Sequence, residues 1–163
     1  MIAFIGMGTN LGDRWGNLAL AARRLRESGA VAIVRASRVW DTEPMGPPQP
    51  RYLNAVLELE TSLTPRALLA LLRRVERAAH RRRDGARWGA RTLDLDLLLF
   101  GERVLSEPGL KVPHPGIADR PFVLAPLAEL APALVVPGTG RTVEQLVADV
   151  SLEGIRPVGI FPG

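Results

Sequence analysis

Two aspartates, Asp94 and Asp96, stand inside the apolar run RTLDLDLLLF at residues 91–100. Side chains two residues apart on a β-strand point to the same face, about 7 Å apart along the chain. A buried carboxylate is costly unless a cation or a hydrogen-bond donor compensates it. Two carboxylates on one face can hold Mg²⁺, with phosphate oxygens as further ligands. The alternative is the ordinary solvated face of an antiparallel sheet.

Strict alternation assigns the two faces of this strand. The face that should belong to the hydrophobic core carries Leu93, Leu95, Leu97 and Leu99. The opposite face should carry the aspartates, followed by Leu98 and Phe100. Because apolar side chains follow the carboxylates, this face is not uniformly polar, which favours a site over a solvated surface.

A dense run of arginines precedes the aspartates. The 21 Lys and Arg residues include one lysine, Lys111, so the chain contains 20 arginines. Eight of these fall between residues 73 and 91: Arg73, Arg74, Arg77, Arg81, Arg82, Arg83, Arg87 and Arg91. Such a local positive field suits phosphate-bearing ligands or nucleic acid. A solvated basic surface, or an arginine bias of the coding sequence, is the alternative.

The elements that must position these residues alternate along the chain. Strands are expected at residues 2–8, 30–40, 52–61 and 92–100, a hairpin at 101–105, and helices at 14–28, 65–80 and 142–150. The order β-α-β-β-α-β predicts an α+β fold, a ferredoxin-like sandwich whose mainly antiparallel sheet has helices packed on one face. No linker or repeat interrupts it, so residues 1–163 are expected to form a single domain.

Local signals support three of these elements. Residues 52–61 alternate, with Leu53, Ala55, Leu57 and Leu59 opposite Asn54, Val56, Glu58 and Glu60. Thr64 and Pro65 form an N-cap and a first-turn proline for the second helix. Thr142 and Gln145 form a capping box for the third.

Composition excludes several classes of protein. The chain is 47% hydrophobic, which is typical of a globular domain, and it contains no cysteine, which excludes disulfides and thiolate metal sites. With only His80 and His114 available, a metal is expected to be bound by oxygen. The N-terminus has no signal-peptide pattern and no stretch has the length of a membrane span. A cytoplasmic protein without membrane contact is therefore expected.

Four segments together resemble the 6-hydroxymethyl-7,8-dihydropterin pyrophosphokinases, folate-pathway enzymes that move a diphosphate from ATP to a pterin alcohol. RWGARTLDLDLLLFG resembles the family signature, and GMGTNLGDR resembles its N-terminal glycine-Ser/Thr-Asn-Leu segment. DTEPMGPPQPRYLNAV resembles its Thr-x-Pro-x-Gly loop and following strand, and VPHPGIADRPFVLAPLAELAP resembles its His-Pro segment and helix. The resemblance covers residues 1–137.

The resemblance implies a role for each matching residue. Asp94 and Asp96 would hold two Mg²⁺ ions that bridge the ATP phosphates, and Arg81 and Arg91 would clamp the transferred diphosphate. ATP would further contact a set comprising Arg83, Arg87, Trp88, His114 and Arg120. The pterin pocket would comprise Thr42, Pro44, Met45, Gly46, Tyr52, Asn54 and Phe122, with Tyr52 and Phe122 stacking on the two faces of the ring. Gly8, Thr9 and Asn10 would form a strand-end turn that shapes the site; a purely structural turn is the alternative.

This sequence departs from the family pattern at four positions. Pro115 removes a possible adenosine contact, and Ala90 stands where proline often precedes the final arginine of the run. Arg73 and Arg82 add charge where relatives are often neutral. These differences bear on affinity and on the behaviour of the expected Arg/Trp lid, in which Gly85, Trp88 and Gly89 lie, rather than on the type of reaction.

The expected enzyme takes ATP and hydroxymethyl-dihydropterin as its small-molecule partners, acts as a monomer, and has no nucleic-acid partner. A ferredoxin-like RNA-binding module is one alternative, but Asp94 and Asp96 would repel the RNA backbone. A metal-dependent nuclease using the paired aspartates is the other. Formation of AMP from ATP and the pterin alcohol separates all three.

Overall fold

The computed structural model describes residues 1–44, 48–81 and 93–163, with His80 and Arg81 described as backbone only. A six-stranded antiparallel sheet forms its centre, built from β1 (Ile2–Thr9), β2 (Val31–Ala36), β3 (Val39–Thr42), β4 (Tyr52–Thr61), β5 (Asp94–Phe100) and β10 (Ile155–Gly159). The strand order is β10-β3-β4-β1-β5, and β2 pairs with β4 beside β3. The α+β fold with an antiparallel sheet is confirmed, whereas the single strand expected over residues 30–40 is divided into β2 and β3.

In the described part of the chain, four helices accompany the sheet: α1 (Arg14–Glu27), α2 (Pro65–Arg81), α3 (Pro121–Leu130) and α4 (Val143–Ala148). Both predicted caps are confirmed, since the backbone N–H of Ala67 donates to the Thr64 hydroxyl and Thr142 and Gln145 cap each other reciprocally. The smaller elements are two hairpins, β6 (Leu105–Glu107) with β7 (Leu110–Val112) and β8 (Val135–Val136) with β9 (Arg141–Thr142), and the 3₁₀ helix η1 (Ile117–Asp119). The hairpin expected at residues 101–105 thus lies at 105–112.

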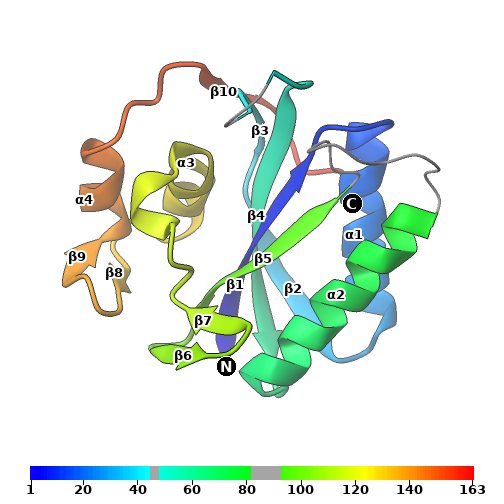
Figure 1. The fold of residues 1–163 in the computed structure, drawn as a ribbon, viewed down its shortest axis with the longest axis horizontal. Helices are drawn as coiled ribbons and strands as arrows, with labels where there is room; N and C mark the ends of the chain where they lie inside the picture. The colour runs from blue at the N-terminus through cyan, green and yellow to red at the C-terminus, as the bar shows by residue number, and fades with distance from the viewer. Residues whose placement is uncertain (45–47, 82–92) are drawn as a thin grey trace.

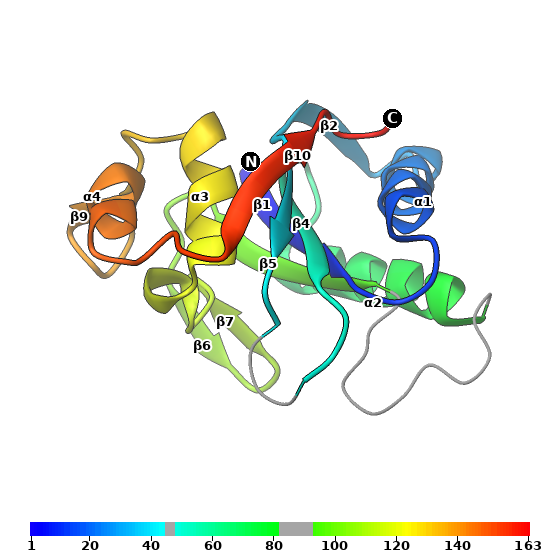
Figure 2. The ribbon, with the colours of Figure 1, turned by 90° about the horizontal axis from the view of Figure 1, so that it is seen from above.

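Helices cover both faces of the sheet, so the expectation of helices on one face is wrong. Helices α1 and α2 lie on one side of the sheet and α3 and α4 on the other (Figure 1; Figure 2 shows the same layers from above). Each side has its own hydrophobic core: Ile5, Leu57 and Leu95 belong to the first, and Val56 and Leu98 belong to the second. The second core exists because the same strands also carry apolar side chains on this face, such as Val56 of β4 and Leu98 of β5.

A bulge in β5 corrects the faces predicted for its last residues. The pairing with β1 is continuous from Gly8↔Asp94 to Ile5↔Leu97, but Phe4 then pairs with Leu99, so Leu98 is the extra residue. An extra residue reverses the alternation beyond it. Leu99 therefore joins the core on the carboxylate face and Phe100 joins the opposite core, the reverse of the prediction.

Candidate active site

Two glycines of β1 keep the sheet open between the aspartates and the next strand. Gly8 pairs with Asn54 of β4 on one side and with Asp94 of β5 on the other. One pleat away, Gly6 pairs in the same way with Val56 and Asp96. Residues paired across an antiparallel ladder project to the same face. A glycine in the middle of each row thus places no side chain between those of β4 and β5.

A cavity of about 310 Å³ occupies this space. Its floor is the sheet, and its other walls come from the end of β3 and from the N-terminal turn of α3, which covers this face. It is lined by Gly6, Met7, Gly8, Thr42, Glu43, Tyr52, Asn54, Ala55, Val56, Asp94, Asp96, Arg120, Phe122 and Val123. The structure therefore brings together seven candidates that lie up to 80 residues apart in the sequence, and it places Gly8 of β1 beside them; the seven are Thr42, Tyr52, Asn54, Asp94, Asp96, Arg120 and Phe122.

The Asn54 amide is buried in this cavity wall and held in one orientation. Its side chain carbonyl accepts a hydrogen bond from the hydroxyl of Thr42, which is also buried. Its Nδ2 donates to the backbone carbonyl of Met7 at 3.2 Å. An amide with both ends engaged presents a fixed pattern of one donor and one acceptor to a ligand. Such a pattern suits the polar edge of a flat heterocycle.

Arg120 and Phe122 close the cavity from the α3 side. Pro121 is the first residue of α3, and Arg120 occupies the position before it. The Arg120 guanidinium lies over the Phe122 ring at 5.9 Å from its centroid, within the range of a cation–π interaction. The partly buried Phe122 and Tyr52 thus supply two aromatic surfaces from different elements of the fold.

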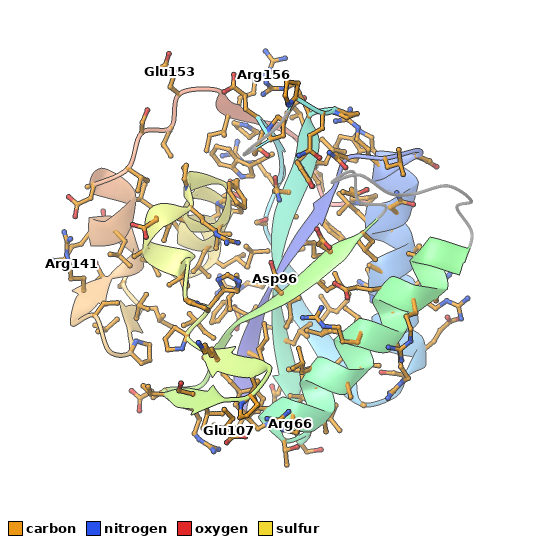
Figure 3. The ribbon with its side chains drawn as sticks, viewed as in Figure 1. Arg66, Asp96, Glu107, Arg141, Glu153 and Arg156 are labelled. Carbon is orange, nitrogen blue, oxygen red and sulfur yellow. The ribbon has the colours of Figure 1, made fainter. Side chains whose placement is uncertain are left out.

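A second cavity, of about 250 Å³, lies beside the first. It is lined by Leu69, Arg73, Asp96, Leu97, Gly109, Leu110, Lys111, His114 and Pro115. Asp96 borders both cavities, whereas Asp94 lines the first. Figure 3 shows Asp96 near the middle of the molecule, on β5 between the helices of the two layers. Molecules bound in the two cavities would meet at this carboxylate.

A backbone hydrogen bond to the bulge of β5 holds His114 at the second cavity. Its backbone N–H donates to the Leu98 carbonyl at 2.9 Å, which ties the segment after β7 to the strand that carries the aspartates. Its Nδ1 accepts a hydrogen bond from the backbone N–H of Gly116 at 3.1 Å. In the neutral imidazole the proton therefore resides on Nε2, which is left as a donor.

The pKa of His114 is lowered from its ordinary 6.5. Burial is the main cause; the negative charge of Asp96 partly opposes it, and the positive charge of Arg120 adds to it. In the pH interval between this lowered pKa and 6.5, the unfolded chain binds more protons than the folded one. This residue should therefore make the free energy of unfolding rise with pH up to about 6.5 and contribute no pH dependence above it.

A proton NMR titration checks this expectation. The imidazole signal that disappears in His114→Gln should titrate below pH 6.5 in the wild-type protein. The signal of His80 serves as an internal comparison in the same spectrum. A His114 pKa at or above 6.5 would show that burial does not dominate its surroundings.

Several predicted site residues cannot be compared with these cavities. Met45, Gly46, Arg83, Arg87, Trp88 and Arg91 lie outside the described residues, as does the side chain of Arg81. Pro44 is described and stands after β3, but it does not line the first cavity. Within the described parts of the chain, no group of three or more His, Cys, Asp or Glu side chains gathers as a metal site. A cation at Asp94 and Asp96 would therefore need oxygen ligands from a bound molecule or water.

Sequence reasoning missed several residues that line the cavities. Gly6 could have been found, because it stands two residues before Gly8 and must share its face. Glu43, Val123, Leu69 and Lys111 carry no such signal, since only the packing of loops and helices against the sheet brings them to the cavities. The described helices include none long and apolar enough to cross a membrane.

Comparisons with known proteins show the family of this chain. The family model "7,8-dihydro-6-hydroxymethylpterin-pyrophosphokinase (HPPK)" matches residues 4–132. The 2-amino-4-hydroxy-6-hydroxymethyldihydropteridine pyrophosphokinase of Pseudomonas aeruginosa is 42% identical over 154 residues, which is 94% of both chains. The protein of the same description from Synechocystis is 41% identical over 156 residues, covering 96% of this chain and 80% of that one.

A solved structure supports the fold independently of sequence. The HPPK-DHPS A437G structure of Plasmodium falciparum superimposes with a TM-score of 0.73 at 13% identity. It covers 90% of this chain, which in turn spans 45% of that longer one. This match shows the fold, and the matches in sequence show the family. The chain belongs to the 7,8-dihydro-6-hydroxymethylpterin-pyrophosphokinase family and is an ATP-dependent pyrophosphokinase of folate biosynthesis.

Proposed function

We propose that the pterin alcohol binds in the first cavity, that ATP binds in the second, and that diphosphate is transferred beside Asp96. The position of Asp96 carries this proposal, because it is the aspartate that borders both cavities. The hydroxymethyl oxygen of the pterin attacks the β-phosphorus of ATP in line, and AMP leaves. Two adjoining cavities hold the reacting atoms together, which removes much of the entropic barrier to a reaction between two substrates.

The first cavity has the chemistry to recognise a pterin. Tyr52 and Phe122 offer aromatic surfaces for stacking on a flat bicyclic ring. Asn54, oriented by Thr42, offers both a donor and an acceptor to its edge. These contacts orient the hydroxymethyl group towards the side of the cavity where Asp94 and Asp96 lie.

The two aspartates fit a pair of Mg²⁺ ions by their donor chemistry. Both are oxygen ligands on one face of β5, and the glycines opposite them leave room for phosphates. When bound, Mg²⁺ would neutralise phosphate charge and favour in-line transfer. The chain's own contribution is to hold Asp94 and Asp96 at fixed positions and to exclude water from the cavity.

The remaining roles follow from charge and position. Nε2 of the neutral His114 donates to the nucleotide, and Arg120 at the cavity wall interacts with its phosphates. Arg81 and Arg91 clamp the transferred diphosphate, while Arg83, Arg87 and Trp88 close over it. Support for these five residues is the resemblance of RWGARTLDLDLLLFG and the preceding arginines to the family signature. The loose transition state of phosphoryl transfer makes such positive charge more important than a strong base.

One assay tests the activity directly. The protein is incubated with MgATP and 6-hydroxymethyl-7,8-dihydropterin, and AMP and the pterin diphosphate are quantified. Equal amounts of both products are expected, with little AMP when the pterin is omitted. Release of ADP, or hydrolysis of ATP that does not depend on the pterin, would contradict the proposed transfer. Parallel incubation with RNA and DNA would detect nuclease activity.

Phe122→Ala is expected to weaken pterin binding far more than ATP binding. The substitution removes one stacking surface, and stacking is worth on the order of 1 kcal/mol beyond the area it buries, or at least about a fivefold loss. Calorimetric titration with each ligand measures the two effects separately. Leu134→Ala is a control, because Leu134 packs against the same core away from the cavity. Equal losses for both ligands would place Phe122 in the core rather than in the pterin site.

We further propose that the protein acts as a monomer in the cytoplasm. ATP, the co-substrate, is abundant in the cytoplasm. Sedimentation equilibrium of the protein tests the first point, since a stable dimer would contradict it.

A further inference from the structure

Strand β5 stands at the end of the sheet order, so its outer edge has no strand partner among the described strands. Such an edge presents backbone N–H and C=O groups that no neighbouring strand pairs. This matters here because β5 carries Asp94 and Asp96. The backbone N–H and carbonyl of Leu95, which lies between the two aspartates, face this outer edge. Both nevertheless have hydrogen-bond partners.

Two side chains of α2 bind this one residue. The backbone N–H of Leu95 donates to Oε2 of Glu76 at 2.7 Å. Nη1 of Arg73 donates to the Leu95 carbonyl at 2.9 Å. Arg73 and Glu76 also form an ion pair with each other, 2.8 Å between Nη1 and Oε1. The three interactions replace the missing neighbouring strand at this single position.

The two peptide groups held in this way are those that join Leu95 to the aspartates. The N–H of Leu95 belongs to the peptide group that follows Asp94, and its carbonyl belongs to the one that precedes Asp96. Peptide groups are planar, so fixing both planes restricts the directions of the Cα–Cβ bonds on either side. On the other edge, β1 pairs with the same segment through Met7↔Leu95. The backbone between the aspartates is thus held from both sides.

We infer that Arg73 and Glu76 are positioning residues that set the separation and orientation of the two aspartates for metal binding. Neither needs to touch the metal or the substrates for this role. The inference rests on the proposed metal site at Asp94 and Asp96. It also gives a function to Arg73, a position at which this chain differs from the family pattern. The side chain of Glu76 is 14% exposed, so water competes little for the hydrogen bonds that its carboxylate accepts.

The test measures metal binding without turnover. Mn²⁺ or Mg²⁺ is titrated into the protein in the presence of a non-hydrolysable ATP analogue, by electron paramagnetic resonance or calorimetry. Glu76→Ala should weaken metal affinity about tenfold or more, as is typical when a group that orients the metal ligands is lost. Arg73→Gln should weaken it less, because the Glu76 contact with the Leu95 N–H remains. Glu76→Gln should recover part of the loss, since its side chain carbonyl can still accept that hydrogen bond.

Two further readouts separate positioning from simple stabilisation. Amide hydrogen exchange at Leu95 should accelerate in Glu76→Ala without metal present, and the Mg²⁺ concentration that gives half-maximal rate should rise. Arg74→Gln, an exposed arginine on the same helix, is the control and should change none of these quantities. Lower thermal stability with unchanged metal affinity in both Glu76 variants would overturn the inference. So would Arg73→Gln weakening the ATP analogue at unchanged metal affinity, because this would make Arg73 a nucleotide contact.

Asp96→Asn in the same titration distinguishes failure of the inference from failure of the proposed metal site. If Asp96→Asn weakens metal binding and the Glu76 variants do not, the metal site stands and the positioning role is wrong. If Asp96→Asn binds metal like the wild type, the metal site itself is wrong, and the positioning role falls with it.

Discussion

Asp96→Asn and Asp94→Asn should each lower the rate of diphosphate transfer by roughly a thousandfold, equivalent to about 4 kcal/mol of transition-state stabilisation. The amide keeps the shape of the side chain but removes the negative charge that a divalent cation needs. Both residues are held in the ladder with β1 by backbone pairing, which the substitutions leave intact. The fold should therefore survive, and single-turnover measurement of AMP formation should report on the chemical step.

Glu102→Gln is the matched control for charge. Glu102 is an exposed carboxylate in the turn that follows β5, so its neutralisation should leave the rate near that of the wild type. Asp96→Asn should have the broader effect of the two site variants, since Asp96 borders both cavities. Turnover above a tenth of the wild-type rate in either site variant would contradict an essential role for that carboxylate.

Gly8→Ala should reduce the affinity for the pterin by roughly 10- to 100-fold while leaving ATP binding nearly unchanged. A Cβ at this position would lie 2.9 Å from Nδ2 of Asn54 and 3.5 Å from the Tyr52 ring. Relief requires the Asn54 amide to move away from Thr42 and the Met7 carbonyl, and misplacing buried polar groups costs about 1–3 kcal/mol. Calorimetry with each ligand, and a melting curve for stability, measure the effect.

Gly6→Ala is the comparison, because Gly6 occupies the same face of the same strand one pleat away. Its Cβ would meet Leu98 at 3.3 Å, the end of an apolar side chain that can shift without breaking a hydrogen bond. A smaller loss of pterin affinity is therefore expected than for Gly8→Ala. Wild-type pterin binding by Gly8→Ala would show that the Asn54 amide is not held where the pterin binds.

Local sequence rules predicted the parts of this protein that depend on near neighbours. The period of two along a strand placed Asp94 and Asp96 on one face, and the structure brings both to the first cavity. Cap residues such as Thr64 and Thr142 predicted where helices begin, because the hydrogen bond of a cap forms within one turn of the helix. The family resemblance named Tyr52, Asn54 and Phe122 as neighbours, and the cavity lining now includes all three.

Only the tertiary structure decided which face α3 covers and how the last residues of β5 point. The bulge at Leu98 arises from the pairing of β5 with β1, a long-range contact that alternation within β5 cannot reveal. It turns Leu99 and Phe100 to faces opposite to those predicted, and the Leu98 carbonyl at this point binds the backbone of His114.

The sharing of Asp96 by two cavities was likewise decided in three dimensions. It depends on the start of α3 and its N-cap bringing Phe122 and Arg120 over one side of the aspartate. It also depends on β7 and the segment after it bringing Lys111 and His114 to the other. The sequence by itself determined that two carboxylates share a face, since strand geometry is local. Which groups surround them follows from the packing of segments distant in the chain, because burial and hydrogen bonding are satisfied over the whole fold at once.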